Sequence, residues 1–347
     1  MKTPTEPWRK RRRPGLQDIA DRVGTTKMTV SRCLREPSTV SQPLRTRIQD
    51  AARELGYLPN HAPMMLAGAP SKSIGVMVPS VTNHVFAEVL AGVVETAETA
   101  GYRVVIAHYG YDQLAEERGI ASLISANIDG LILGDREHTD DALRMINLAD
   151  IPVIEVMDSR SPCLQQAVGY DNHDAGYAMT AAMLAQGCRK LVYLAVRLDA
   201  RTLQRREGYS KAMQDHGFQP VSVETAEKST FTGGALLMRQ VMRDHPETDG
   251  IFCTNDDVAV GAYFECLRQG ISVPDDMAIA GFHALDIGQA MIPRLASVRT
   301  DRYGIGARAM TELLARLKGG PPFDPVIDLG FQIDLGETVT KRRGARP

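Results

Sequence analysis

A pair of short helical patterns opens the chain. Apolar residues recur every three or four positions across 16–23, and they do so again across 30–34. Gly24 lies between the two patterns and permits a sharp turn. Thr25 or Thr26 can then accept a hydrogen bond from the free amides that begin the second helix. The pattern predicts two short helices joined by a tight turn.

A third helical pattern follows Ser41 and ends at Gly56, and beyond residue 73 apolar runs alternate with helical segments. The apolar runs predict strands at 74–79, 104–108, 131–133, 153–156, 191–196, 251–254 and 277–282. The helical segments lie near 85–100, 113–125, 140–148, 175–186, 202–216, 234–243 and 258–269. Continuous apolar strands between helices indicate parallel sheets covered on both faces. The predicted fold is an α/β body of two doubly wound parallel-sheet subdomains, with a ligand cleft between them, behind an all-α head.

Charge separates the head from the body more clearly than the net charge of −2 suggests. Residues 1–70 carry 13 Lys and Arg against 6 Asp and Glu, a net +7, whereas residues 71–347 carry 27 against 36, a net −9. A basic head suits a polyanionic partner. The basic run at 9–13 taken alone could be a solvated tail, but the helix pair beside it resembles a helix-turn-helix that presents its second helix to DNA bases. The outer face of that helix carries Lys27, Met28, Thr29 and Arg32.

The segment from Tyr57 to Ser73 has two interpretations. Its three prolines exclude a regular strand, yet its apolar Met64-Met65-Leu66 run is not typical of a purely polar linker. It could form a short hinge helix whose Leu66 wedges into a DNA minor groove, or it could pack on the body. The residues alone leave both open.

Several classes of protein are disfavoured by what the sequence lacks. No apolar run has membrane-spanning length and no signal peptide is evident, so we expect a cytoplasmic protein rather than a periplasmic sugar-binding protein. The five cysteines have no metal-ligand spacing, which favours reduced structural thiols and no metal. No phosphate-binding, dinucleotide-binding, zinc-protease or nucleophile-elbow motif is present, so we expect neither an enzyme nor a cofactor. Acid and base groups are available at several positions, but they form no recognisable catalytic set: His108, His138, Glu155, Asp158 and Asp256.

The order of head, hinge and two-lobed body resembles the lactose/galactose repressor family over residues 14–335. The resemblance is carried by DIADRVGTTKMTVSRCL, ELGYLPNHAP, IGVMVPS, IDGLIL, GYDN, TNDDVAVGA and VPDDMAIAGF, in that order. Within the family, VTNHVFAEVL, AHYGYD and IAGFHALDIGQAMIPRLASV are most similar to the gluconate-utilisation repressors. The resemblance implies a periplasmic-binding-protein-like body and a homodimer that binds double-stranded operator DNA. A sugar-acid effector, gluconate or a close relative, would release the DNA.

The resemblance also implies roles for individual residues in the head and hinge. Arg32 can bond a guanine through two parallel donors, whereas Lys27 can reach base or phosphate and Met28 only an apolar group such as a thymine methyl. Phosphate contacts are expected from Thr26, Thr29 and Ser31. The hinge positions are Asn60 and Leu66, with Leu66 in the wedge position.

The effector site implied by the resemblance draws on several motifs of the body. Its first members are Asn83, Phe86, Arg205, Asn255 and His283, and further candidates are Arg136, Glu155, Asp171 and Arg201. Arginine matches both oxygens of a carboxylate, and amide or carboxylate side chains can bond polyol hydroxyls. Family members that bind neutral sugars usually carry Asp at position 283, and histidine there would not repel an acidic ligand.

Ketogluconate and 6-phosphogluconate remain alternative effectors. A phosphate would need several converging cations, which Arg136, Arg201 and Arg205 would supply only if they meet. The chain lacks a terminal leucine heptad helix and so favours a dimer. The expected segments are a basic tail at 1–15, the helix-turn-helix at 16–58, the hinge and linker at 59–72, the effector-binding and dimerisation domain at 73–335, and a basic tail at 336–347.

Overall fold

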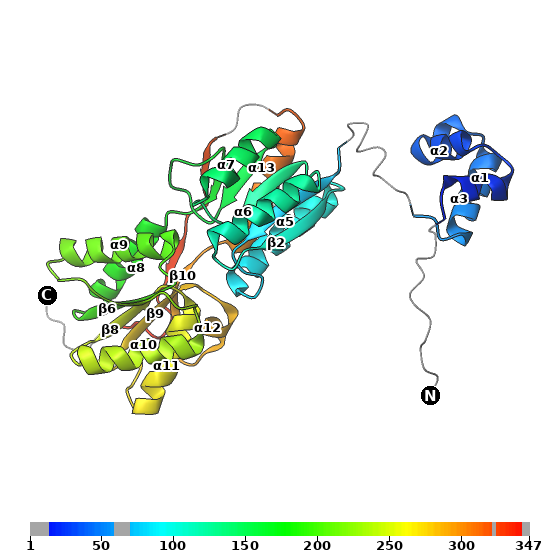
Figure 1. The fold of residues 1–347 in the computed structure, drawn as a ribbon. Coiled ribbons are helices and arrows are strands. Elements are labelled where there is room, and N and C mark those ends of the chain that lie inside the picture. Colours follow the sequence, from blue (N-terminus) through cyan, green and yellow to red (C-terminus); the bar gives the residue numbers. More distant parts are fainter. Residues whose placement is uncertain (1–13, 59–69, 321–323, 342–347) are drawn as a thin grey trace, which may run out of the picture. The chain divides into compact units, whose positions relative to one another are not determined.

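The computed structural model describes residues 14–58, 70–320 and 324–341. The chain divides into two compact units, Met1–Ala69 and Pro70–Pro347, here called the head and the body. Figure 1 shows the helices of the head and the helices and strands of the body. None of the helices within the described ranges is long and apolar enough to cross a membrane.

Three α-helices and a short 3-10 helix make up the described part of the head. They are α1 (Leu16–Val23), α2 (Lys27–Arg35), η1 (Pro37–Thr39) and α3 (Gln42–Glu54). Gly24 adopts the left-handed conformation (φ 71°) that the turn after α1 requires, and Thr26 caps α2 by accepting a hydrogen bond from the amide of Thr29. Ser41 precedes α3, but its side chain makes no capping hydrogen bond. Ile19 and Ile48 are fully buried where the helices meet.

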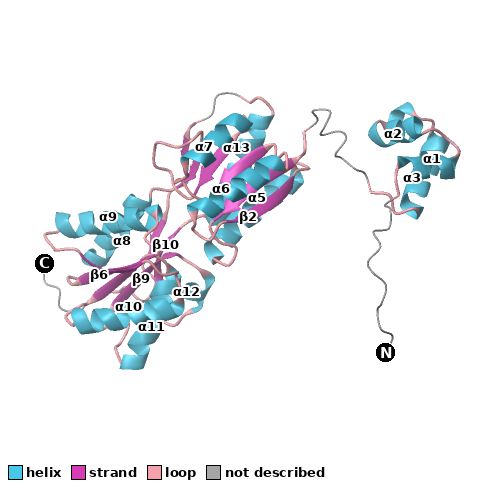
Figure 2. Cartoon of the chain, in the orientation of Figure 1, coloured by secondary structure: helices cyan, strands magenta, loops and turns pink. Residues whose placement is uncertain are grey.

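The first lobe of the body is a parallel sheet with helices on both faces (Figure 2). Its strands, in spatial order, are β11 (Val326–Asp328), β5 (Ala167–Gly169), β4 (Val153–Val156), β3 (Gly130–Leu133), β1 (Ser73–Val78) and β2 (Arg103–His108). Helices α5 (His84–Thr99) and α13 (Arg302–Leu317) pack together, as do α6 (Gln113–Ser125) and α7 (Asp140–Ala149). These layers bury β1, β3 and β4 along their whole length, which explains why these strands read as continuous apolar runs, whereas edge strand β2 is partly exposed.

The second lobe repeats this architecture. Its strands, in spatial order, are β12 (Gln332–Asp334), β10 (Ala296–Arg299), β9 (Ala278–His283), β8 (Gly250–Cys253), β6 (Leu191–Val196) and β7 (Val221–Thr225), with β12 antiparallel to β10 and the other pairings parallel. Its helices are α8 (Asn172–Ala185), α9 (Ala200–Asp215), α10 (Phe231–Asp244), α11 (Asp256–Gln269) and α12 (Asp286–Ala290). The packed pairs are α8 with α9 and α10 with α11.

The chain passes between the lobes three times, after β5, after β10 and after β11. The second passage brings α13 back to the first lobe, where it packs closely on α5. A Cβ on Gly306 would lie 2.0 Å from the carbonyl oxygen of Val89, so this helix pair requires glycine at its closest approach. Three crossings between two rigid sheets make a hinge at the edge where parallel strands end and ligands bind.

The basic C-terminal tail was expected to begin at residue 336, but part of this segment is buried against the body. Thr338 and Val339 are buried, and the Thr338 hydroxyl donates to the carbonyl of Ile279 at 2.6 Å and accepts from the amide of Ala296 at 2.7 Å. Thr338 and Val339 therefore pack on the second lobe, where the threonine hydroxyl supplies hydrogen-bond partners for one backbone group of β9 and one of β10.

Candidate functional site

The outer face of α2 presents the side chains that the sequence assigns to DNA. Lys27 and Arg32 are exposed, and Met28 is 82% exposed, although a methionine gains free energy from burial. The opposite face holds Val30 and Cys33 in the core of the head, which fixes the direction in which the exposed face points. An exposed apolar side chain between two cations suits a groove that offers both methyl groups and acceptors.

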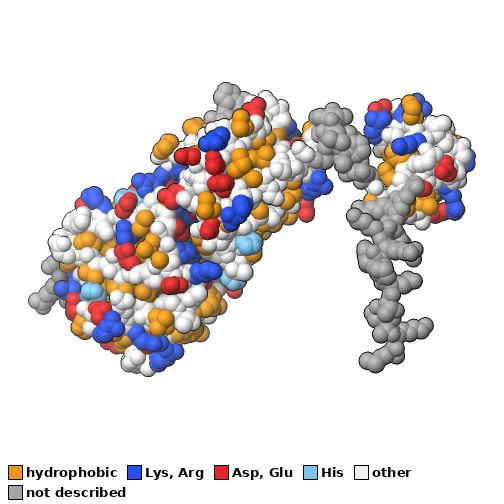
Figure 3. Space-filling view, in the orientation of Figure 1, with side chains coloured by type: hydrophobic (Ala, Val, Ile, Leu, Met, Phe, Trp, Pro, Cys, Tyr) orange, Lys and Arg blue, Asp and Glu red, His pale blue; other side chains and the backbone are white. Residues whose placement is uncertain are grey.

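The hydroxyl groups at the start of α2 are already engaged. The Thr26 and Thr29 hydroxyls lie 2.9 Å apart, and Thr26 accepts from the Thr29 amide at 3.2 Å. Ser31 is half-buried. Lys and Arg side chains are visible at several places on the surface of the head, with hydrophobic and acidic side chains between them (Figure 3). The expected hinge residues Asn60 and Leu66 and the basic run at 9–13 lie outside the described residues.

A small cavity lies between the two lobes of the body, at the carboxyl ends of their strands. Its volume is about 20 Å³. It is lined by Asn83, Val85, Phe86, Tyr111, Met157, Arg197, Asp199, Arg201, Arg205 and His283. The structure thus brings together five of the nine predicted effector residues, namely Asn83, Phe86, Arg201, Arg205 and His283. The volume accommodates about one water molecule, so a sugar acid enters only if the lobes or side chains move apart.

The first lobe contributes the start of α5 to this central cavity. Asn83 caps the helix by accepting from the amide of Val85 at 3.0 Å, and its Nδ2 donates to the Tyr111 hydroxyl at 3.3 Å. The Phe86 ring lies beneath the Arg201 guanidinium, with 5.6 Å between its centroid and the arginine carbon. This wall combines one amide, one phenol and an aromatic face, which suits a polyol with polar and apolar sides.

The second lobe contributes three arginines and a histidine. Arg205 is buried and lies over the Phe282 ring at 3.8 Å. Burial is the main cause that holds the pKa of His283 well below 6.5, and the neighbouring arginines, Arg205 first among them, lower this pKa further. The imidazole is therefore neutral at physiological pH and can exchange hydrogen bonds with hydroxyl groups. Burial alone would raise the pKa of Asp199, but Arg201 and Arg197 outweigh it and hold the pKa at about 2.

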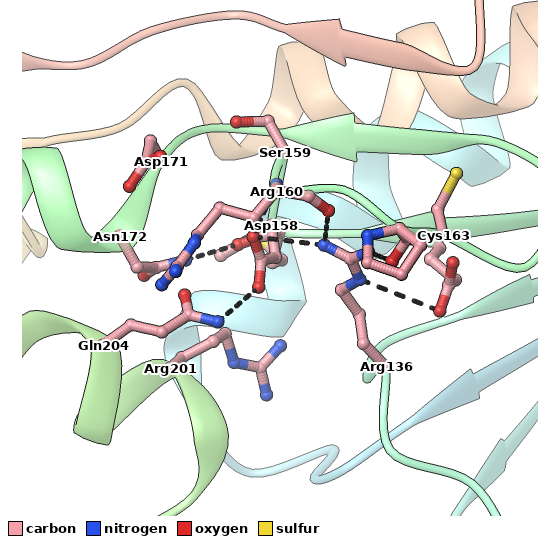
Figure 4. Close-up of polar contacts among 12 residues, drawn as sticks. Arg136, Asp158, Ser159, Arg160, Cys163, Asp171, Asn172, Arg201 and Gln204 are labelled. Atoms are coloured by element: carbon pink, nitrogen blue, oxygen red, sulfur yellow. Dashed lines mark hydrogen bonds and ion pairs between the residues drawn. The ribbon is translucent and has the colours of Figure 1, made fainter.

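A larger cavity of about 430 Å³ adjoins the same interlobe region and shares Arg201 with the central cavity. Two hydrogen bonds cross between the lobes here. The Arg201 guanidinium donates to the carbonyl oxygen of Gly134 at 2.6 Å. Gln204 Nε2 donates to the Asp158 carboxylate at 2.9 Å (Figure 4). These contacts hold the first turn of α9 against the loops after β3 and β4, so opening of the lobes must break them.

Arg136 does not offer its guanidinium to the central cavity. Its two terminal nitrogens donate to the carbonyl oxygens of Arg160 and Pro162, and one lies 3.4 Å from the Asp158 carboxylate (Figure 4). The loop after β4 thus supplies the guanidinium with two carbonyl acceptors. The three cations Arg136, Arg201 and Arg205 therefore do not line one cavity as a set.

Three other predicted effector residues have structural partners outside the central cavity. Glu155 is buried beside His138, with 3.6 Å between Oε1 and Nε2, and its Oε2 accepts from the amide of Leu164. Asp171 caps α8, and Asn255 caps α11 while accepting from the hydroxyl of Ser229. Capping accounts for both residues, since Asp and Asn satisfy the free amides at helix starts.

Sequence reasoning missed five residues of the central cavity, namely Val85, Tyr111, Met157, Arg197 and Asp199. Tyr111 and Arg197 have left-handed backbones (φ 66° and 64°), as does Leu198 (φ 57°). Such conformations are uncommon without glycine, and residue identity gave no signal for them. The one available indication that these residues line a site was their position: AHYGYD and the run after LAVRL both follow the ends of strands, where ligands of α/β sheets bind.

The geometry can be compared with known proteins. Residues 15–60 match the family described as bacterial regulatory proteins, lacI family, and residues 71–324 match periplasmic binding proteins and sugar binding domain of LacI family. The chain is 53% identical over 330 residues to the HTH-type transcriptional regulator GntR of Escherichia coli K12, covering 95% of this chain and 100% of the relative.

Two solved structures share the fold. A LacI-family transcriptional regulator from Silicibacter pomeroyi is 30% identical, with a TM-score of 0.88 and coverage of 94% of this chain and 99% of the other. Transcription regulator GntR from Chromobacterium violaceum is also 30% identical, with a TM-score of 0.75 and coverage of 77% and 99%. Both the head and the body are therefore parts of one known architecture.

Proposed function

Because the chain belongs to the LacI family of bacterial regulatory proteins, we propose that it represses gluconate uptake and utilisation genes and leaves its operator when gluconate binds between its lobes. The family membership makes the chain a DNA-binding transcriptional regulator and not an enzyme. The gluconate assignment rests on the similarity to gluconate-utilisation repressors and on the charge of the central cavity.

The observation that carries the effector assignment is the convergence of Arg197, Arg201 and Arg205 beside a neutral His283. Three guanidinium groups favour an anion, and Arg pairs with carboxylates through two parallel donors. The amide and phenol groups of Asn83 and Tyr111 supply partners for hydroxyl groups. A polyol chain with a carboxylate at one end carries the groups that complement these side chains.

Ketogluconate and 6-phosphogluconate are the alternative effectors. A phosphate needs several cations with free donors. Arg136 is one of the three arginines expected to supply them, but its guanidinium is hydrogen-bonded to the loop after β4. Arg201 and Arg205 also donate within the protein. The site thus favours a singly charged sugar acid, with ketogluconate as the nearest competitor.

Release from DNA follows from the position of the cavity between the lobes. The effector needs more than about 20 Å³, so its binding favours an arrangement in which the cross-lobe bonds of Arg201 and Gln204 have changed. The protein acts as a homodimer whose two heads read a pseudo-palindromic operator. The exposed Val105 and Ile106 on edge strand β2 are apolar positions that a second copy would cover.

A melting experiment with a ligand panel tests this function. Gluconate, ketogluconate, 6-phosphogluconate and glucose are each added to the purified protein at matched ionic strength. A ligand that binds only the native state adds RT ln(1 + [L]/Kd), or about 2.7 kcal/mol at one hundred times Kd. We expect gluconate to raise the melting temperature most. A rise with only another member of the panel would overturn gluconate and leave the family assignment intact.

A further inference from the structure

The three arginines of the central cavity differ in how many of their donors are already used. Arg205 donates through Nε to Asn172 at 2.9 Å, through Nη1 to the carbonyl of Thr254 at 2.8 Å and through Nη2 to the Tyr170 hydroxyl at 3.2 Å. Arg201 donates through Nη1 to the Gly134 carbonyl, and its Nη2 lies 3.7 Å from the Asp135 carboxylate. Both guanidinium groups are tied to protein acceptors.

Arg197 differs from the other two. Its Nε donates to the Asp199 carboxylate at 3.2 Å, and neither of its terminal nitrogens makes a hydrogen bond to any residue in the described ranges. Only 13% of the side chain is exposed, and the guanidinium lines the cavity, where a ligand can reach its terminal nitrogens. A pair of parallel N–H groups without a protein acceptor is the arrangement that a carboxylate completes.

The Arg197 guanidinium also has a defined platform. It lies over the ring of Tyr111, with 4.9 Å from the guanidinium carbon to the ring centroid, and Tyr111 belongs to the opposite lobe. The Tyr111 hydroxyl accepts from Asn83 Nδ2, which fixes the ring at the start of α5. Stacking on an aromatic face orients the planar guanidinium and leaves its outer edge for a ligand.

The backbone on both sides of this contact is held in an unfavourable conformation. Arg197, Leu198 and Tyr111 all have positive φ, and the amide of Arg197 donates to the carbonyl of Glu227 at 3.1 Å. Non-glycine residues are uncommon in this region and persist where surrounding contacts enforce them. Strain on both partners of one cross-lobe contact supports a functional role for that contact.

We propose that Arg197 reads the carboxylate of the effector, with Tyr111 as its platform and Asp199 as the group that orients it. This inference rests on the proposed function, in which the effector is a sugar acid. Arg201 and Arg205 supply positive potential and shape the wall, whereas Arg197 supplies the free pair of donors. Arg197 therefore determines the preference for an acid over the neutral compound with the same hydroxyl groups.

The test compares gluconate with gluconamide, which keeps the hydroxyl groups and lacks the charge. Affinities are measured by calorimetry, with competition for the weaker ligand, for the wild type and for Arg197→Gln. Loss of a largely buried charge-assisted pair should lower gluconate affinity roughly thirty-fold and bring the gluconate-to-gluconamide ratio close to one. Arg197→Lys, which retains charge without the fork, should give an intermediate ratio.

Arg206→Gln is the matched control, because Arg206 lies on the same helix as Arg205 but donates to both oxygens of Glu224 on an exposed face. Its gluconate affinity should equal that of the wild type. An Arg197→Gln or Arg197→Lys protein with wild-type affinity and ratio would overturn the role of Arg197 alone. A wild-type protein that binds no sugar acid would instead overturn the proposed function, which separates the two failures.

Discussion

Replacement of Arg205 by methionine should destabilise the body as well as impair effector binding. The side chain is 3% exposed and donates to Asn172, Thr254 and Tyr170. Methionine retains an apolar stem of similar length, so the main loss is that of three hydrogen bonds to buried acceptors. Each acceptor left unpaired costs about 1–3 kcal/mol, and partial rescue by water and by rotation of the tyrosine hydroxyl brings the expected total to about 3–5 kcal/mol.

This loss corresponds to a fall in melting temperature of roughly 6 to 20 °C for a unit of this size. Differential scanning calorimetry on the full chain measures it. Arg206→Met is the control, since the exposed Arg206–Glu224 pair contributes at most about 1 kcal/mol. Operator affinity at a temperature where both variants are folded should match the wild type, because Arg205 belongs to the body. If Arg205→Met melts together with Arg206→Met, the three buried bonds do not stabilise the body and the reasoning is wrong.

Four further predictions concern pH and DNA. Burial lowers the pKa of His138, but its hydrogen bond to Glu116 and the nearby Glu155 carboxylate outweigh this and raise the pKa to about 9. Urea stability should therefore fall as pH rises from about 6.5 through 9, and His138→Gln should flatten that fall. Burial outweighs two hydrogen bonds to raise the pKa of Asp256 to about 7, so stability should also fall between about pH 4 and 7, and Asp256→Asn should abolish this earlier fall. Arg32→Ala should reduce the preference for operator over other DNA by about 1–3 kcal/mol per half-site in binding titrations, and it should relax discrimination at one base pair. Discrimination that stays at the wild-type level would exclude a base contact by Arg32. Leu66→Ala should reduce DNA bending in mobility-shift assays with little change in salt dependence, whereas wild-type bending would favour packing of Leu66 on protein.

The buried central strands were predictable because their environment leaves a direct trace in the sequence. Strands such as β1 and β6 are buried along their whole length and read as continuous apolar runs. Edge strand β7 was missed, since its half-buried pattern alternates with polar residues over only five positions. Helix α13 was also missed, because Gly304 and Gly306 weaken its helical propensity, although Gly306 is what allows its close packing on α5.

The site was predictable only as far as residue type indicates position. Arg205 belongs to the RREGY segment, in α9, and His283 to the GFH segment that ends β9, and the structure places both in the central cavity. Arg136 occupies a similar position in sequence, but its guanidinium turns into the loop after β4, which no sequence pattern indicates. Arg197 and Tyr111 depend on left-handed backbones and on a contact between lobes, and both are set by tertiary packing rather than local propensity.

The central claim is that gluconate releases this protein from DNA. Fluorescence anisotropy with a labelled operator, recovered by in vitro selection with the purified full chain, measures this directly at fixed salt. We predict that gluconate lowers operator affinity at least ten-fold, equivalent to a coupling of about 1.4 kcal/mol, and that glucose leaves it unchanged. Operator binding that stays the same at saturating gluconate, in a preparation whose melting temperature gluconate does raise, would contradict the account.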